Sequence, residues 1–316
     1  MRRCLYCYNE LGEETTDFHR TCSKKIFGTP VPPELQYSED DMLQLAEKVI
    51  RSQSTVTGIQ PKLSLHLEKL SKKDEPQRFT ITGLWGGYIL KPPFKQYKFL
   101  PEIEDLTMHL AEISGIEVVP HSLIRLSSGN LSYITKRIDR INELKIHMED
   151  MCQLTERLTE QKYQGSHEQI AKAIFKYSVN PGLDVTNFFE QVLFSFLSGN
   201  ADMHLKNFSL IDNPDMGYVL SPAYDLVSSA LVVEGDTEEL ALTLNGKKKN
   251  LRKKDFVESM TRSHIDNKAI ENLFNRFEVL IDNWHKFIDI SFLPDELKNG
   301  YKDLIEKRFN RIYGQN

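Results

Sequence analysis

Residues 199–209 read Gly-Asn-Ala-Asp-Met-His-Leu-Lys-Asn-Phe-Ser and form the most informative polar stretch of the chain. They follow a strongly apolar helical pattern that includes Phe188 and Phe196. Asp184 is expected to cap that helix and Gly199 to end it. So many polar side chains directly after a core helix predict a functional site.

A β-hairpin is predicted immediately after this polar loop. Two strand-like runs within residues 208–220 flank a turn at 213–215. The second run would bring Asp225 back beside Asn207 and near Asp202. Two carboxylates and an amide oxygen are hard ligands that suit Mg²⁺, which completes its shell with water and substrate phosphates.

This spacing is similar to the catalytic loop of protein kinases. There an Asp accepts the proton of the substrate hydroxyl, while an Asn five residues later and an Asp beyond a hairpin hold the metal ions. Asp202, Asn207 and Asp225 match this order. His204 stands where those kinases usually have lysine. A neutral imidazole could bond the γ-phosphate or the nucleophile, with activity changing near pH ~6.5, or His204 could simply pack against the backbone.

The kinase interpretation requires a phosphate-binding lysine and an acidic partner in the N-terminal half. Lys91 ends the strand-like run at 88–91, and Glu104 lies in a helix predicted over about 102–114. Glu102 is the competing partner for the lysine. A Lys–Glu ion pair could orient the lysine on the α- and β-phosphates.

A polar loop at 51–62 joins a helix predicted from Ser38 onward to the first strand. Its backbone amides around Thr57 and Gly58 could cradle phosphate, and Lys62 could add a charge. Short β-rich runs predict a mostly antiparallel sheet with one inserted helix, with strands at 63–67, 78–82, 88–91, 122–126 and 131–136.

Together these features resemble a HipA-type serine/threonine kinase, the toxin of a bacterial type II toxin–antitoxin pair, over roughly residues 36–310. The motifs that carry the resemblance are Ser-Thr-Val-Thr-Gly-Ile-Gln-Pro-Lys at 54–62, the lysine strand at 88–92, Arg-Ile-Asp-Arg at 137–140, Glu-Asp-Met-Cys-Gln at 149–153, the loop at 199–209 and Ala-Tyr-Asp-Leu-Val-Ser at 223–228.

The resemblance implies an α+β, two-lobed protein-kinase-like fold with a β-rich N-lobe (37–140) and a mainly helical C-lobe (141–316). It further implies ATP with Mg²⁺ and phosphorylation of a protein hydroxyl, in known family cases on an aminoacyl-tRNA synthetase. A HipB-like helix-turn-helix antitoxin would be the partner, and DNA would be contacted only through it. Because the phosphate loop begins near residue 54, the chain is expected to resemble shorter members in which the N-terminal subdomain is absent or separately encoded.

Residue roles follow from the same resemblance. Asp202 would be the catalytic base, with His204 in support, and Asn207 and Asp225 would hold Mg²⁺. Lys91, paired with Glu104, would bind the phosphates of ATP together with Thr57, Gly58 and Lys62. The backbones of Lys136 and Ile138 would face adenine, Asp139 would contact ribose, and Thr55 or Thr57 would be autophosphorylated.

The first 36 residues contain three of the four cysteines and are expected to form a small appendage and linker. Cys4, Cys7, His19 and Cys22 have the C-x₂-C and H-x₂-C layout of a tetrahedral Zn²⁺ site. Such a site would be structural. The alternative is a flexible N-terminus with incidental cysteines.

Composition limits the remaining classes of function. The net charge of −5, from 40 Lys and Arg against 45 Asp and Glu, gives no field that favours nucleic acid. No apolar run suggests a membrane span or a secretory signal, so we expect a cytoplasmic protein. Two alternative hypotheses for the function are a small-molecule kinase of the aminoglycoside or choline type and a non-catalytic co-repressor that binds an antitoxin.

Overall fold

The computed structural model divides the chain into two compact units. Unit 1 comprises residues 1–105, 119–143 and 290–292, and unit 2 comprises 106–118, 144–289 and 293–316. The residues that the structure describes are 2–13, 17–42, 44, 62–68, 77–82, 86–141, 144–233, 235 and 237–314. Within these residues no helix has the length and apolar character needed to cross a membrane.

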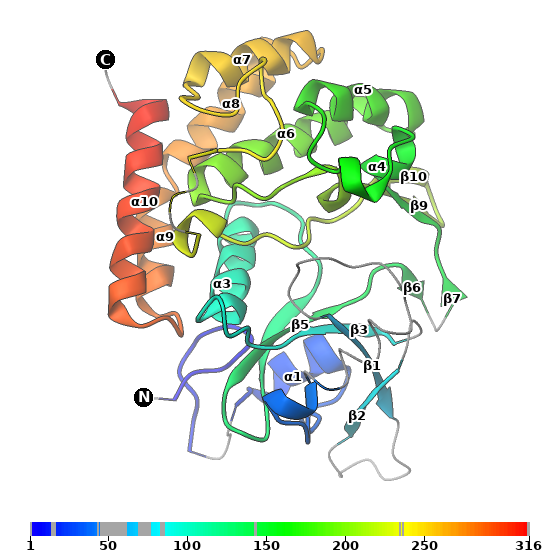
Figure 1. The fold of residues 1–316 in the computed structure, drawn as a ribbon, viewed down its shortest axis with the longest axis vertical. Coiled ribbons are helices and arrows are strands. Elements are labelled where there is room, and N and C mark those ends of the chain that lie inside the picture. Colours follow the sequence, from blue (N-terminus) through cyan, green and yellow to red (C-terminus); the bar gives the residue numbers. More distant parts are fainter. Residues whose placement is uncertain are drawn as a thin grey trace. The chain divides into compact units, whose positions relative to one another are not determined.

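Unit 1 is built on an antiparallel sheet with the strand order β2-β1-β3-β5-β4 among the described residues (Figure 1). Its strands are β1 (Leu63–Glu68), β2 (Arg78–Ile81), β3 (Tyr88–Lys91), β4 (His121–Arg125) and β5 (Leu131–Lys136). All five coincide with the predicted runs to within one or two residues. Most of their buried side chains are apolar or β-branched, as a half-buried pleated surface favours, and the buried polar exceptions include Lys91 and His121.

The helix predicted between these strands is α3 (Leu100–Ile113), and Gly115 follows it with a positive φ of 85°. Its apolar face is completely buried, with Ile103, Leu106 and Leu110 all at 0% exposure. The predicted helix after Ser38 is observed over Glu39–Met42, where Ser38 and Asp41 exchange hydrogen bonds. Gln44 is also helical, whereas residues 43 and 45–50 lie outside the described residues.

The N-terminal segment packs onto the sheet of unit 1. Helix α1 (Arg20–Phe27) ends at Gly28, which has a φ of 77°. The ring of Phe27 meets those of Phe79 and Tyr88 with centroid distances of 5.8 and 6.2 Å. Such aromatic clusters bury large apolar areas, so they fix the helix on β2 and β3.

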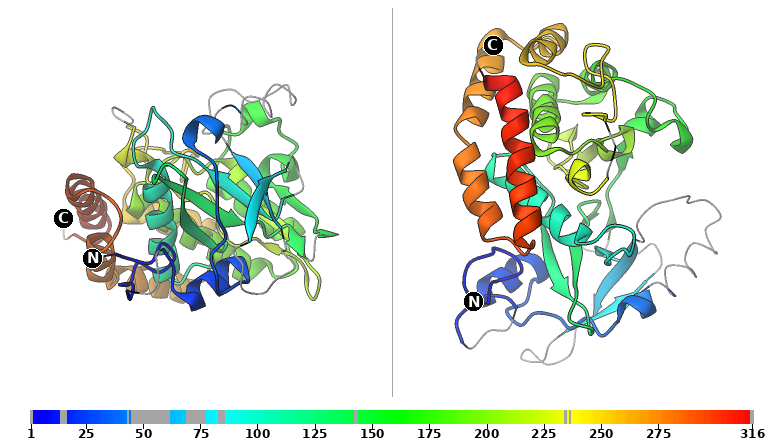
Figure 2. Two further views of the ribbon diagram at one scale, coloured as in Figure 1. Left: turned by 90° about the horizontal axis from the view of Figure 1, so that it is seen from below. Right: turned by 60° about the vertical axis from the view of Figure 1, so that its left-hand side comes forward.

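Unit 2 is mainly helical. Its helices are α4 (Met151–Leu154), α5 (His167–Tyr177), α6 (Pro181–Ser198), α7 (Lys253–Arg262), α8 (Asn267–Glu278), α9 (Ile281–Asp289) and α10 (Asp295–Tyr313), with 3₁₀ turns at Thr159–Gln161, Leu205–Asn207 and Ser229–Leu231. Helices α9 and α10 lie side by side (Figure 2). Its sheet has the order β10-β9-β8, formed by β8 (Met148–Asp150), β9 (Ser209–Asn213) and β10 (Gly217–Leu220). The short strands β6 (Arg140–Ile141) and β7 (Leu144–Lys145) precede it.

Helix α6 is the buried core helix that precedes the polar loop. The prediction that Asp184 caps it is wrong, because the helix begins at Pro181 and its N-cap is Asn180. Proline is favoured at the first helical position, since its φ is preset and its missing amide is not needed there. Asp184 lies one turn inside and accepts the amide of Leu220 at 2.8 Å. The prediction that Gly199 ends the helix is confirmed by its left-handed φ of 73°.

Candidate functional site

The polar loop after α6 is held by backbone hydrogen bonds on both sides. The Asn200 amide donates to the Ser195 carbonyl at 2.8 Å, and the Ala201 amide donates to Ser229 Oγ at 2.9 Å. Asn200 and Ala201 are buried, whereas Asp202 is exposed. The loop therefore presents one carboxylate to solvent from a fixed backbone.

Asp202 is oriented by a tyrosine that the sequence did not reveal. The Tyr163 hydroxyl donates to Asp202 Oδ1 at 2.7 Å. Burial, reinforced by the charge of Asp202, raises the pKa of Tyr163 well above its usual value, so the phenol remains a donor. An exposed carboxylate that is held in one orientation is suited to accept a proton from a hydroxyl. Tyr163 lies 39 residues before Asp202, and no local pattern connects the two.

Asn207 and Asp225 lie on either side of the hairpin β9–β10, which forms as predicted. Asn207 is 8% exposed, and its Oδ1 accepts the His204 amide at 3.2 Å. Asp225 has a φ of 56°. The neighbouring Tyr224 hydroxyl donates to the Lys206 carbonyl at 3.0 Å, which returns the chain beside Asn207.

The charges of Asp202 and Asp225 both act on His204, which is buried between them along the chain. Burial lowers the pKa of His204 to about 4, although the charges of Asp202 and Asp225 act in the opposite direction. Its ring lies edge-on to Tyr163, with centroids 5.0 Å apart. The expectation of a protonation change near pH 6.5 is wrong, because a buried imidazolium is poorly solvated. His204 is therefore neutral around pH 7.

Asn207 and Asp225 offer oxygen atoms of the kind that could hold a Mg²⁺ ion. An amide oxygen and a carboxylate are the hard donors that this ion takes from proteins. The left-handed backbone of Asp225 supports the same interpretation, since a non-glycine residue in that conformation is uncommon and such conformations cluster at ligand-binding sites.

In unit 1, Lys91 and Glu104 form a buried ion pair. The Lys91 Nζ bonds Glu104 Oε1, and the side chains are 4% and 3% exposed. The Lys91 Nζ also lies 5.3 Å from the centre of the Tyr133 ring. Glu102, the competing partner, is not in this pair. Burial raises the pKa of Glu102 to about 7, with a further contribution from the charge of Asp105.

The residues expected to face adenine and ribose lie after β5. The Lys136 amide donates to the Pro120 carbonyl at 2.8 Å, so a contact of Lys136 with adenine would have to use its own carbonyl. Asp139 accepts two hydrogen bonds from Arg137, at 2.8 and 2.6 Å. Burial opposes its charge, but Arg137 and Arg140 outweigh that effect and lower the pKa of Asp139. Ile138 is partly exposed.

The predicted phosphate loop, including Thr55, Thr57 and Gly58, lies outside the described residues. Lys62 is described, and it is exposed just before β1.

The four predicted zinc ligands in the N-terminal segment, Cys4, Cys7, His19 and Cys22, are described. Their ligand atoms lie within 4.8 Å of one another.

Comparison with known proteins identifies relatives over most of the chain. A family model described as HipA-like C-terminal domain matches residues 54–284. A Sinorhizobium fredii protein named "Putative kinase Y4dM" is 29% identical over 77% of this chain and 60% of its own length. The serine/threonine-protein kinase toxin HipA of Shewanella oneidensis is 28% identical over 60% of this chain and 46% of its own length. The chain thus spans about half to three fifths of these relatives.

Solved structures with a similar fold include two kinase-related proteins. A chain of the Shewanella oneidensis toxin–antitoxin complex of HipA, HipB and operator DNA aligns with a TM-score of 0.66 and 22% identity, over 85% of this chain and 71% of that one. The Helicobacter pylori proinflammatory kinase CtkA aligns with a TM-score of 0.55 and 15% identity, over 79% of this chain and 93% of that one. The fold is thus two-lobed and kinase-like, with a β-rich and a mainly helical lobe.

Proposed function

The chain belongs to the HipA-like C-terminal domain family, and from this we propose that it is an ATP- and Mg²⁺-dependent serine/threonine protein kinase. The observation that carries the proposal is the loop after α6, which exposes Asp202, orients it through Tyr163 and places Asn207 and Asp225 at the adjoining hairpin. The order and spacing of these groups are those of a kinase catalytic loop.

The chemistry assigned to Asp202 is general base catalysis. Its carboxylate would accept the proton of a substrate serine or threonine hydroxyl as that oxygen attacks the γ-phosphorus, while the bond from the γ-phosphorus to the bridging oxygen breaks and ADP leaves. The Tyr163 hydrogen bond limits the rotation of the carboxylate, so the accepting oxygen is positioned before substrate arrives. Phosphoryl transfer depends mainly on positioning and charge neutralisation, which this loop can supply.

The other groups would hold ATP and its metal. Asn207 and Asp225 would hold Mg²⁺, which neutralises charge on the phosphates when bound. Lys91, kept in place by Glu104, would contact the α- and β-phosphates. Lys136, Ile138 and Asp139 would line the adenosine side, and the loop with Thr57, Gly58 and Lys62 would cover the phosphates.

The finer biological role is also a proposal. We infer a protein substrate, with an aminoacyl-tRNA synthetase as the first class to test, and autophosphorylation at Thr55 or Thr57. The Shewanella oneidensis HipA relative is a toxin whose complex contains HipB and operator DNA. By analogy, this chain would be the toxin of a pair and would bind a HipB-like antitoxin.

The test is phosphotransfer from Mg·[γ-³²P]ATP by the full chain, alone and with cell lysate. We expect Asp202→Asn to reduce incorporation by roughly 10²–10⁴-fold with little change in melting temperature. Asp215→Asn is a matched control, because Asp215 is exposed in the turn of the same hairpin. Incorporation by Asp202→Asn at the level of the unmodified chain would refute the role of Asp202.

The nature of the product separates the rival functions. Labelled protein, or a gain of ~80 Da on the chain itself, supports a protein kinase. A labelled small molecule from the lysate would favour the small-molecule kinase instead. A chain that neither binds ATP nor transfers phosphate would favour the non-catalytic co-repressor.

A further inference from the structure

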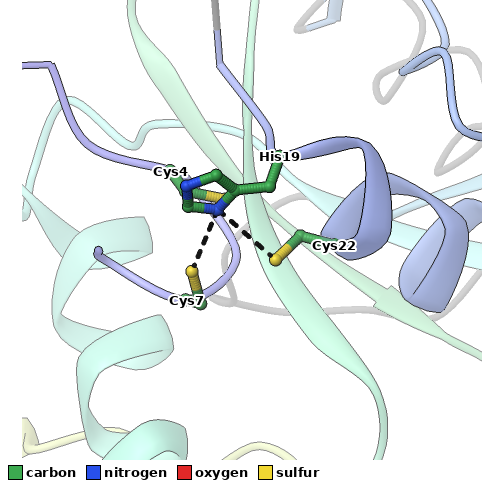
Figure 3. A group of neighbouring side chains, drawn as sticks. All are labelled: Cys4, Cys7, His19 and Cys22. Atoms are coloured by element: carbon green, nitrogen blue, oxygen red, sulfur yellow. Dashed lines mark hydrogen bonds between the residues drawn. The ribbon is translucent and has the colours of Figure 1, made fainter. Parts of the chain in front are cut away.

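Four side chains of the N-terminal segment converge on one point within unit 1. Figure 3 shows the thiols of Cys4, Cys7 and Cys22 facing the imidazole of His19. The His19 Nδ1 is 3.4 Å from Cys7 Sγ and 3.7 Å from Cys22 Sγ. A tetrahedral Zn²⁺ ion with ordinary bond lengths places its sulfur and nitrogen ligands about 3.5 Å apart. The side chains therefore already have the spacing of a tetrahedral metal site.

The backbone fixes the histidine in the orientation that a metal requires. His19 Nε2 lies 2.9 Å from the Glu10 carbonyl, so Nε2 carries the proton and donates it, which leaves the lone pair on Nδ1. Metal-binding histidines usually have their second nitrogen held in this way. His19 is also the N-cap of α1, and Cys22 lies in the first turn, so one helix start positions two ligands.

Cys4 and Cys7 lie on one tight turn of the backbone. The Tyr8 amide donates to the Cys4 carbonyl at 2.9 Å, and Tyr8 has a φ of 62°. The turn holds the sulfur atoms of Cys4 and Cys7 within 4.8 Å of each other and of the other two ligand atoms, and Cys4 has no exposed surface.

We propose that Cys4, Cys7, His19 and Cys22 bind a structural Zn²⁺ ion. Three thiolates and one imidazole give the closed four-coordinate set of structural zinc sites, with no position left for water or substrate. The proposal is independent of the kinase function, since it uses neither ATP nor any residue of the catalytic loop.

The ion would join two pieces of chain that contact different parts of unit 1. On one side, the Leu5 carbonyl accepts the Leu123 amide of β4 at 3.2 Å, and the buried Tyr8 hydroxyl donates to Asp105 of α3 at 2.7 Å. On the other side, α1 packs through Phe27 on β2 and β3. A segment this short has little core of its own, so a metal is an effective way to order it.

The first experiment measures metal in the full chain, purified without a metal-affinity step. Elemental mass spectrometry should find about one zinc per chain, and Co²⁺ exchanged into the site should show the intense visible bands and thiolate charge transfer of tetrahedral cobalt. Protein with fully reduced thiols and less than about a tenth of a zinc per chain would overturn the proposal, as would iron as the bound metal or a six-coordinate cobalt spectrum.

Variants test the ligand set. Cys7→Ser should lose most of the zinc and lower the melting temperature by ~5 °C or more. His19→Cys should keep about one zinc, because four thiolates also close a tetrahedral site. Cys152→Ser is the matched control, since Cys152 is a buried cysteine of α4 in unit 2, and it should bind zinc normally. Zinc retained by Cys7→Ser, or lost from Cys152→Ser, would contradict the assignment.

Discussion

Tyr163 shows how one side chain can hold the carboxylate that we propose as the catalytic base. Its hydroxyl holds Asp202 Oδ1, and its ring meets that of His204, so it contacts two members of the proposed catalytic loop. Lys162 extends this group, because its carbonyl accepts the Leu205 amide at 3.1 Å. We infer that Tyr163 is a positioning residue for the base.

This assignment predicts a selective kinetic effect of Tyr163→Phe. Without the hydroxyl, Asp202 samples more rotamers, so kcat should fall by ~10-fold, whereas the KM for ATP should stay within about a factor of two. Steady-state kinetics would measure both. Tyr177→Phe, at an exposed tyrosine of α5, is the matched control and should leave kcat unchanged. An unchanged kcat in Tyr163→Phe would remove Tyr163 from the mechanism.

Two properties of single residues could not be decided from the sequence alone: the partner of Lys91 and the burial of His204. The sequence favours Glu104 as the partner of Lys91 but leaves Glu102 as a competitor. Residues two apart on a helix point in different directions, and only the packing of α3 decides which of them faces the lysine. The structure places Glu104 on Lys91. The sequence likewise does not predict that His204 is buried, since its contacts include Tyr163, which is distant along the chain.

At the scale of elements, the junction between α6 and the catalytic loop depends on Gly199. Its φ of 73° is costly for other residues, and a Cβ there would lie 2.5 Å from Leu304 Cδ2 and 3.1 Å from Ser228 Oγ. Both a strained backbone and a steric shift would follow from any side chain at this position.

Gly199→Ala should therefore destabilise the protein by roughly 1–3 kcal/mol and reduce kinase activity, because Asp202 follows three residues later. Urea unfolding and phosphotransfer would measure the two effects. Gly182→Ala, in the first turn of the same helix, meets no atom within 4 Å and should be neutral or stabilising by up to ~1 kcal/mol. Equal stability of the two variants would show that the junction tolerates a side chain.

Elements with a strong local signal were predicted well. The strands of unit 1, helix α3 and the hairpin β9–β10 match the alternation, periodicity and turn residues in the sequence. The start of α6 was misplaced because Asp184 has the composition of a cap but is bonded by Leu220, 36 residues away. Local patterns cannot report such long-range partners.

At the scale of the whole molecule, buried histidines link stability to pH. His167 is completely buried against the rings of Phe188 and Phe208, and its two ring nitrogens have no hydrogen-bond partner among the described residues. Burial lowers the pKa of His167 to about 4, although the charge of Glu168 acts in the opposite direction. The folded state therefore binds this proton less readily than the unfolded chain.

The sign of the effect follows from that difference. The contribution of neutral His167 to the free energy of unfolding is fully present above pH ~6.5. It is lost as the pH falls toward 4, and the loss is about 3 kcal/mol at most. His167→Leu should flatten the fall in unfolding free energy between pH 7.5 and pH 5, as measured by urea denaturation. His147→Leu, which removes a largely exposed histidine, should leave the slope unchanged. A wild-type slope in His167→Leu would exclude His167 as a source of acid sensitivity.

One further consequence comes from the bond between Leu5 and Leu123. Strand β4 is the outermost strand of its sheet, and the chain near Leu5 shields part of its free edge. An unshielded edge can recruit a strand from another molecule. Proteolytic trimming of these first residues should thus turn a well-behaved preparation into one that self-associates on standing, with light scattering that increases with time and concentration.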